Sequence, residues 1–345
     1  MEPAMNYETT GVGRRSAALG ALMGCCLIWA AGACDASGAA GPTRTRVSIE
    51  GTGWRLNGRP TYPGSAAEGL LMNVRMVNAV FEDRGRTDFD PNANTDEFIT
   101  AIPAYVSQGV LAFTLNLQGG FPGYEGAVNS AFNEDGSLRE DYLRRVRRVI
   151  EACDRNGAVV ILGCYYQRQD QILKDADAVR AGVVNVVRWI AACGFTNVVV
   201  EIANEFNHGG FDHAILRRPA GQAELIRLAG RTLPGLAVST SGLGDGRLPD
   251  EVAHASDFLL IHFNGTKAAD IPARIEALRK YGKPIVCNED QKYGREAAEA
   301  ARVSVRNGAS WGFMHDKVNQ HFPFDFKGPD DDPAVYEAIR TLTTP

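Results

Sequence analysis

The sequence predicts one α/β domain, a closed (β/α)8 TIM barrel with a short N-terminal β-hairpin, and three observations support this fold class. Apolar runs rich in β-branched residues alternate with amphipathic stretches, and this happens eight times. The apolar runs lack polar alternation, which indicates strands buried on both faces in a parallel sheet. The eight units span about 280 residues, which is the usual size of such a barrel.

The strands and helices are expected to follow one another in regular order. Strands are predicted at residues 72–81, 110–118, 158–166, 197–205, 236–242, 258–264, 284–290 and 310–316. Helices are predicted near 138–155, 172–192, 220–231, 268–281 and 294–307, with a short one within 248–256 and a last one at 332–342. An open doubly wound sheet is the alternative, but the Gly-rich phosphate turn typical of it does not follow the first strand.

Two local signals place the ends of elements. Asn57-Gly58 stands between two strand-like runs before the barrel and predicts the turn of the hairpin. Asn94 with Glu97 three residues later forms a capping-box pattern, so the first helix is expected to begin at Asn94.

The N-terminal segment has the features of an export signal. Arg14-Arg15 precede an apolar stretch of signal-peptide length, shorter than the roughly 20 residues that span a membrane. We therefore expect a signal peptide at 1–34, a linker at 35–45 and the barrel at 46–345. The protein would then be exported to the periplasm, the exterior or the membrane surface. Cys34 follows small residues and is a candidate lipid anchor. Cys25, after Leu22-Met23-Gly24, competes with it, and a plain cleaved signal peptide is the alternative to both.

Composition and charge exclude several classes of partner. The net charge of -5 is spread along the chain without a basic run, so we expect no nucleic-acid binding. No cysteine after the leader has CxxC spacing, so no metal site is expected. We expect no cofactor either, and a monomer.

Polar side chains gather where the predicted strands end. The carboxyl ends of the strands carry the chemistry of such barrels. Glu205, preceded by Asn204, ends the fourth strand, and Glu289 lies at the end of the seventh. Further candidates for holding a substrate lie at the ends of other strands: Gln118, Tyr166, His262 and His315. Two facing carboxylates suit glycoside hydrolysis, because one donates a proton to the leaving oxygen while the other attacks the anomeric carbon.

Glu201 competes with Glu205, since both side chains lie on the same side of the fourth strand. Four residues at about 3.3 Å each place Glu201 roughly 13 Å deeper in the barrel. We expect this carboxylate to be buried and to hydrogen-bond an arginine, with Arg75 on the first strand as the partner.

Asn204-Glu205 in EIANE and Glu289 in KPIVCNED resemble the hallmark of the clan of retaining glycoside hydrolases that includes the family 5 cellulases and mannanases. His262-Phe263 in LIHFN fits the same pattern, and the resemblance covers roughly 46–345. It implies a carbohydrate substrate, Glu205 as the acid/base, Glu289 as the nucleophile and Asn204 as a partner of the sugar 2-hydroxyl.

Three residues usual in that clan are missing here, namely the arginine near the end of the second strand, the histidine after the third and the tryptophan at the end of the eighth. Their absence indicates a divergent branch. A carbohydrate-binding protein that has lost turnover on the same barrel is the alternative function.

Overall fold

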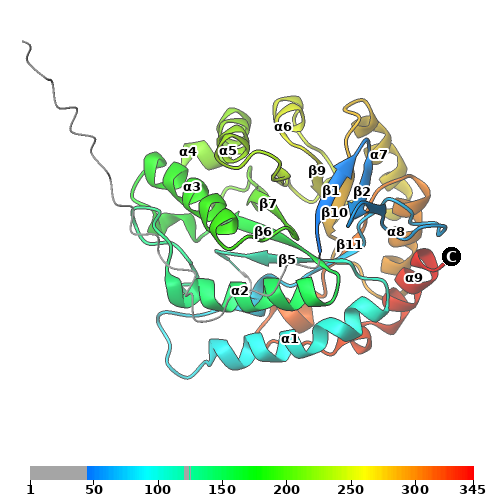
Figure 1. Ribbon diagram of the computed structural model, residues 1–345, viewed down its shortest axis with the longest axis horizontal. Helices are drawn as coiled ribbons and strands as arrows, with labels where there is room; N and C mark the ends of the chain where they lie inside the picture. Colours follow the sequence, from blue (N-terminus) through cyan, green and yellow to red (C-terminus); the bar gives the residue numbers. More distant parts are fainter. Residues whose placement is uncertain (1–44, 120–123, 125) are drawn as a thin grey trace, which may run out of the picture. The chain divides into compact units, whose positions relative to one another are not determined.

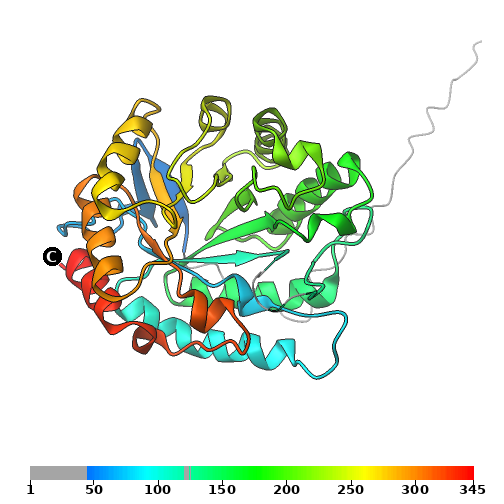
Figure 2. The same cartoon turned by 180° about the vertical axis from the view of Figure 1, so that it is seen from behind.

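Parallel strands close into a barrel surrounded by helices (Figures 1 and 2). The computed structural model describes residues 45–119, 124 and 126–345. Six strands form one sheet in the order β11-β4-β5-β6-β7-β8, and β10 pairs with β9. Parallel bridges join the two sheets and complete the ring: Ser241–Leu260 on one side, Val286–Ser310 and Asp290–Phe313 on the other. The predicted fold class is confirmed.

All eight predicted apolar runs contain a barrel strand. The strands are β4 (Asn73–Arg75), β5 (Ala112–Asn116), β6 (Val159–Tyr165), β7 (Val198–Ala203), β8 (Val238–Ser239), β9 (Leu259–His262), β10 (Ile285–Glu289) and β11 (Gly312–Phe313). Each strand is shorter than its apolar run because the run continues into loops that are themselves buried, so hydrophobicity alone does not mark where the hydrogen-bonded ladder ends.

The helices alternate with the strands as predicted. They are α1 (Pro91–Ser107), α2 (Glu140–Arg155), α3 (Ala176–Ala192), α4 (Ala214–Arg217), α5 (Pro219–Thr232), α6 (Asp250–Ala255), α7 (Ile271–Arg279), α8 (Gly294–Arg306) and α9 (Pro333–Thr343). Their apolar faces and the outward-facing strand residues form the main hydrophobic core.

The predicted start of the first helix at Asn94 is wrong. Helix α1 begins one turn earlier, at Pro91, and the Asp90 side chain accepts hydrogen bonds from the backbone N–H groups of Asn92 and Ala93. Proline suits the first helical position because its missing N–H would be unpaired there in any case. Asp90 therefore outcompetes the capping-box pattern formed by Asn94.

The predicted hairpin is confirmed as part of a three-stranded antiparallel sheet, β1 (Val47–Glu50), β2 (Gly53–Leu56) and β3 (Arg59–Pro60). Asn57 and Gly58 form the turn between β2 and β3 with φ angles of 52° and 79°, which few residues other than asparagine and glycine adopt readily. Trp54 on β2 is 1% exposed, and its ring lies 5.2 Å from that of Phe258, just before β9. Trp54 joins the smaller apolar cluster inside the barrel, so the hairpin closes the barrel's amino-terminal end.

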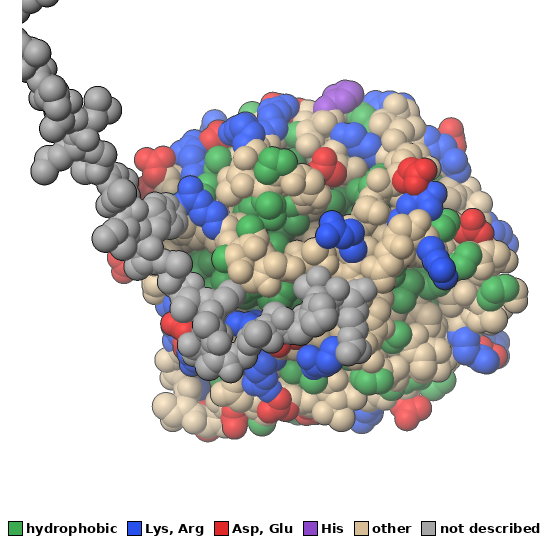
Figure 3. All heavy atoms as spheres, in the orientation of Figure 1, with side chains coloured by type: hydrophobic (Ala, Val, Ile, Leu, Met, Phe, Trp, Pro, Cys, Tyr) green, Lys and Arg blue, Asp and Glu red, His purple; other side chains and the backbone are tan. Residues whose placement is uncertain are grey.

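The surface and the N-terminal segment add little to the position of the site. Acidic and basic side chains are interspersed over the face shown in Figure 3. Among the described residues, no helix has both the length and the apolar character needed to cross a membrane. The predicted signal peptide and Cys34 lie outside the described residues.

Candidate active site

Two carboxylates and one imidazole meet at the carboxyl ends of the strands. Glu289 is the last residue of β10, His262 is the last of β9, and Glu205 follows the end of β7 by two residues. One oxygen from each glutamate and one ring nitrogen of His262 lie within 4.8 Å of one another. The structure thus brings the two predicted catalytic residues together, with His262 beside both.

Glu289 is surrounded by groups that stabilise its ionised form. Arg75 on β4 is fully buried, and its Nε lies 2.8 Å from Glu289 Oε2. Asn264 Nδ2 donates a hydrogen bond to Glu289 Oε1. Burial on its own would raise the pKa of Glu289, but Arg75, His262 and Asn264 together hold it below its ordinary value. The arrangement therefore presents a charged carboxylate rather than a neutral acid.

His262 lies between the two carboxylates without any exposure to solvent. Its Nδ1 is 3.3 Å from Glu205 Oε1 and 3.5 Å from Glu289 Oε2. Burial opposes a charge on this ring, yet Glu289 and Glu205 raise the pKa of His262 above its ordinary value. The imidazole can therefore hold a proton within reach of both glutamates.

The backbone of Glu205 adopts a left-handed conformation with a φ of 48°. This conformation disfavours any residue with a Cβ and is found mostly where surrounding contacts enforce it. Here the Glu205 N–H donates to Ser241 Oγ over 2.9 Å, and the N–H of Phe206 donates to the Ser241 carbonyl over 3.0 Å. Ser241, just after β8, therefore fixes the direction in which the Glu205 side chain leaves the strand end.

Glu201 lies fully buried below the pair, as predicted, but its hydrogen-bond partner is not an arginine. Ser241 Oγ donates to Glu201 Oε1 over 2.5 Å, and Asn288 Nδ2 donates to Oε2 over 3.3 Å. Arg75 contributes only charge attraction, and burial raises the pKa of Glu201. The predicted arginine hydrogen bond is wrong because Arg75 is engaged by Glu289 and Asn204 instead.

Asn204 and Tyr166 both join this cluster. Asn204 Oδ1 accepts a hydrogen bond of 2.6 Å from Arg75, and its Nδ2 donates to Gln167 Oε1 over 3.1 Å. Tyr166 is 5% exposed, and burial raises the pKa of its hydroxyl, with Glu289, Arg75 and Glu205 as charged neighbours. Its ring rests on the backbone of Gly119, where a Cβ would come within 2.1 Å of it.

The structure shows no hydrogen bond from Gln118 or His315 to Glu205, His262 or Glu289 among the described residues, although Gln118 Oε1 accepts from the N–H of Tyr166 over 3.5 Å. Gln118 has no solvent exposure, and its Nε2 donates to Ser130 Oγ and to the carbonyl of Gln169 over 3.1 and 3.0 Å. The His315 ring lies 4.9 Å from that of Tyr293, at the start of α8. In this arrangement both side chains support neighbouring loops, and their contact with a substrate stays a prediction.

Three residues of the cluster were not identified from the sequence in these positions. The sequence predicts a hydrogen bond from Arg75 to Glu201 rather than an ion pair with Glu289. Asn264 carries a detectable signal, since it follows His262 by two residues in LIHFN. Ser241 has none, because its importance depends on the backbone conformation of Glu205.

The cluster of Glu205, His262 and Glu289 also has the donor types of a metal site. A cation bound there would meet the buried guanidinium of Arg75 at 2.8 Å from the Glu289 carboxylate. Glu289 and Glu205 also raise the pKa of the His262 ring, so protonation competes with metal binding there. Acid–base and nucleophilic chemistry fit these residues better than metal binding.

Comparison with known proteins places the fold. No family model matches the sequence, and no curated protein does. A GH5-4 broad-specificity endoglucanase from Clostridium longisporum covers 82% of this chain and 99% of its own at 9% identity, with a TM-score of 0.57. A glycoside hydrolase family 5 enzyme from Prevotella bryantii covers 83% and 99% at 12% identity, with a TM-score of 0.56.

A third solved structure extends the likeness to mannan-cleaving enzymes. An endo-1,4-β-mannanase from Eisenia fetida covers 87% of this chain and 95% of its own at 11% identity, with a TM-score of 0.58. The chain therefore has the fold of family 5 glycoside hydrolases. The resemblance inferred from the sequence is confirmed at the level of the fold.

Proposed function

We propose that the protein is a retaining glycoside hydrolase that cleaves O-glycosidic bonds of a poly- or oligosaccharide, with Glu289 as the nucleophile and Glu205 as the acid/base. The approach of the two carboxylates carries this proposal. One oxygen of Glu205 and one of Glu289 lie within 4.8 Å of each other, which is compatible with the roughly 5–5.5 Å between the carboxyl groups of retaining pairs. Inverting pairs stand about 6.5–9.5 Å apart to admit a water molecule.

The first step uses the charge held on Glu289. Its carboxylate attacks the anomeric carbon while Glu205 donates a proton to the departing oxygen, and a covalent glycosyl ester on Glu289 results. The lowered pKa of Glu289 keeps the attacking oxygen ionised. Arg75 and Asn264 each contact one oxygen of this carboxylate, which fixes its orientation.

The second step reverses the roles of the proton carriers. Glu205, now ionised, takes a proton from a water molecule, and that water attacks the anomeric carbon and releases Glu289. Each displacement inverts the anomeric centre, so the product retains the configuration of the substrate. His262 Nδ1 contacts Glu205 Oε1 and provides a neighbour with which Glu205 can share its proton between steps.

Hydrolysis of aryl glycosides by the wild type and two variants tests the proposal. Glu289→Ala should abolish turnover, because no other carboxylate can form the ester. Glu205→Ala should still form the ester from substrates with good leaving groups, and added azide should restore its breakdown as a glycosyl azide. Glu276→Ala, on the exposed face of α7, serves as the control and should retain full activity.

Proton NMR of the first product decides the stereochemistry. We expect the anomeric configuration to be retained, and net inversion would exclude Glu289 as a nucleophile. A protein that binds polysaccharides but cleaves no glycoside in a broad panel would instead support the carbohydrate-binding alternative.

A further inference from the structure

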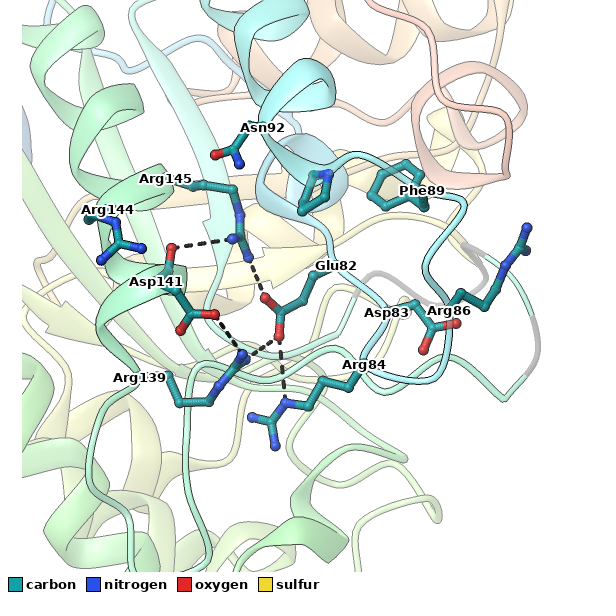
Figure 4. Close-up of a pocket in the computed structure, with 11 residues that line it drawn as sticks. Glu82, Asp83, Arg84, Arg86, Phe89, Asn92, Arg139, Asp141, Arg144 and Arg145 are labelled. Carbon is teal, nitrogen blue, oxygen red and sulfur yellow. Dashed lines mark hydrogen bonds and ion pairs between the residues drawn. The ribbon is translucent and has the colours of Figure 1, made fainter.

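A polar pocket lies between the loop that follows β4 and the first turns of α2 (Figure 4). Its volume is about 430 Å³. The charged residues of its lining comprise five arginines and three carboxylates, an excess of two positive charges: Arg84, Arg86, Arg139, Arg144, Arg145, Glu82, Asp83 and Asp141. The whole chain carries a net charge of -5, so this pocket has the opposite sign to the molecule.

Three of the arginines converge on one carboxylate. Glu82 accepts from Arg139, from Arg145 Nη2 at 2.5 Å and from Arg84 Nε at 3.5 Å, as the dashed lines in Figure 4 show. Arg145 is 4% exposed, and its Nε has no hydrogen-bond partner among the described residues. Burial and the nearby charge of Arg139 lower the pKa of Arg84. Asp141 also pairs with Arg139, so these three guanidinium groups face two carboxylates and one positive charge stays uncompensated.

Arg144 adds a further guanidinium to the pocket. It is exposed on the second turn of α2, and its side chain forms no hydrogen bond or ion pair within the described part of the chain. Arg86 on the opposite loop pairs with the exposed Asp88. Arg144 can therefore turn to an incoming anion without giving up a contact of the folded protein.

Aromatic rings adjoin the arginines on the side of Arg86. Its guanidinium lies over the ring of Tyr124 at 4.8 Å and near that of Phe322 at 5.6 Å. Phe89 lines the pocket and lies 5.9 Å from Phe322, which is 42% exposed. An exposed aromatic face can support the C–H face of a sugar ring, while guanidinium groups bind carboxylate or sulfate groups with paired hydrogen bonds.

The pocket is connected to the candidate active site through shared supports. Glu82 follows Arg75 by seven residues, a reach of at most about 25 Å, which several sugar rings can span. The Glu82 N–H donates to Asn129 Oδ1 over 3.3 Å, and Asn129 Nδ2 donates to the carbonyl of Gly119. The ring of Tyr166 packs against Gly119. The hydrogen-bonded loops that contain Glu82, Asn129 and Gly119 therefore border both the pocket and the candidate active site.

We propose that this pocket binds carboxylate or sulfate groups of an acidic polysaccharide, which makes anionic saccharide chains the substrate class of the proposed hydrolase. The assignment of a substrate class rests on the proposed function. The binding of an anionic saccharide chain does not, and it can be measured without turnover.

Affinity electrophoresis of the full chain tests the proposal with matched polymers. Carboxymethylcellulose and hydroxyethylcellulose share a glucan backbone, but only the first is anionic, and polyacrylate is anionic without sugar. We expect carboxymethylcellulose to retard the wild type most, and retardation to fall with added salt. Arg144→Gln should weaken this binding about five-fold. Arg155→Gln removes an exposed arginine from the last turn of the same helix, outside the pocket, and should leave binding unchanged.

The following results would overturn either this inference or the proposed function. Equal retardation by hydroxyethylcellulose would show that the anionic groups are not recognised, and equal retardation by polyacrylate would show that the sugar is not. Equal losses in the two arginine variants, with matching melting temperatures, would indicate diffuse charge rather than a site. Cleavage of neutral aryl glycosides without binding to carboxymethylcellulose would remove this inference alone, whereas binding without any cleavage would remove only the proposed function.

Discussion

At the scale of single residues, the Glu205 carboxylate depends on a left-handed backbone conformation that a side chain disfavours. We expect Glu205→Gly to be more stable than Glu205→Ala by about 0.5–1 kcal/mol. The relief of left-handed strain, roughly 1–2 kcal/mol, exceeds the extra unfolded-state entropy of glycine, about 0.4–1 kcal/mol. Both variants lose the same carboxylate, so the comparison isolates the backbone.

Urea unfolding of both variants measures this difference. The same pair of substitutions at Glu276, inside helix α7, should show the reverse order, since glycine costs about 1 kcal/mol in a helix interior. Equal stability of Glu205→Gly and Glu205→Ala would mean that Ser241 does not hold a strained backbone.

The pH dependence of activity is expected to follow the ionisation of one residue, Glu289. Glu289 reacts when ionised, and its pKa is held below the ordinary value, so activity should persist above that pKa and disappear as the pH falls through it. Asn264→Ala removes the hydrogen bond to Glu289 Oε1, which raises the pKa of Glu289. The acid limb of kcat/KM should therefore move to higher pH, and kcat/KM at neutral pH should fall about ten-fold.

A merely structural role for Asn264 would lower activity without moving the acid limb. Asn307→Ala, at the C-cap of α8, serves as the control. The acid limb of its kcat/KM profile and its kcat/KM at neutral pH should both match those of the wild type.

At the scale of elements, the start of α1 decides between two competing capping signals, the Asp90 side chain and the capping-box pattern of Asn94 and Glu97. Asp90→Ala should destabilise the protein by about 1 kcal/mol, because the two N–H groups that its carboxylate accepts from lose their partner. Glu97→Ala should have almost no effect, since α1 begins before the capping box that contains Glu97. Thermal and urea unfolding measure both, and a larger cost at Glu97 would contradict the observed helix start.

Elements were easier to predict than contacts, for physical reasons. Each strand is buried on both faces, so its apolar run is visible in the sequence. The ends of a strand depend instead on backbone hydrogen bonds to its neighbours, which residues of almost any type can form and which therefore leave no signal in the sequence. The partner of Glu201 could not be predicted, because Arg75, Ser241 and Asn288 come from three other strands or strand ends, and only the closed ring determines which of them reaches it. The approach of Glu205 to Glu289 was predictable because strand order alone places both at one rim.

At the scale of the whole molecule, the barrel is held unevenly around its circumference. Strands β5, β6 and β7 contain five, seven and six residues, whereas β8 and β11 contain two each. The short strands lie at the two places where only isolated bridges, such as Ser241–Leu260 and Val286–Ser310, close the ring. Short ladders open at lower free energy than long ones.

Native-state hydrogen exchange should therefore separate the strand amides of the barrel into two groups. Amides of β5 to β7 should exchange only by global unfolding, with slopes in denaturant equal to that of the whole protein. Amides of β8 and β11 should exchange earlier through local opening, which would also free Ser241 from Glu205. Mass spectrometry of deuterium uptake under low urea measures both groups. Equal protection around the ring would show that the isolated bridges close the barrel as firmly as the long ladders. In that case no strand beside the candidate active site would open before the whole protein unfolds.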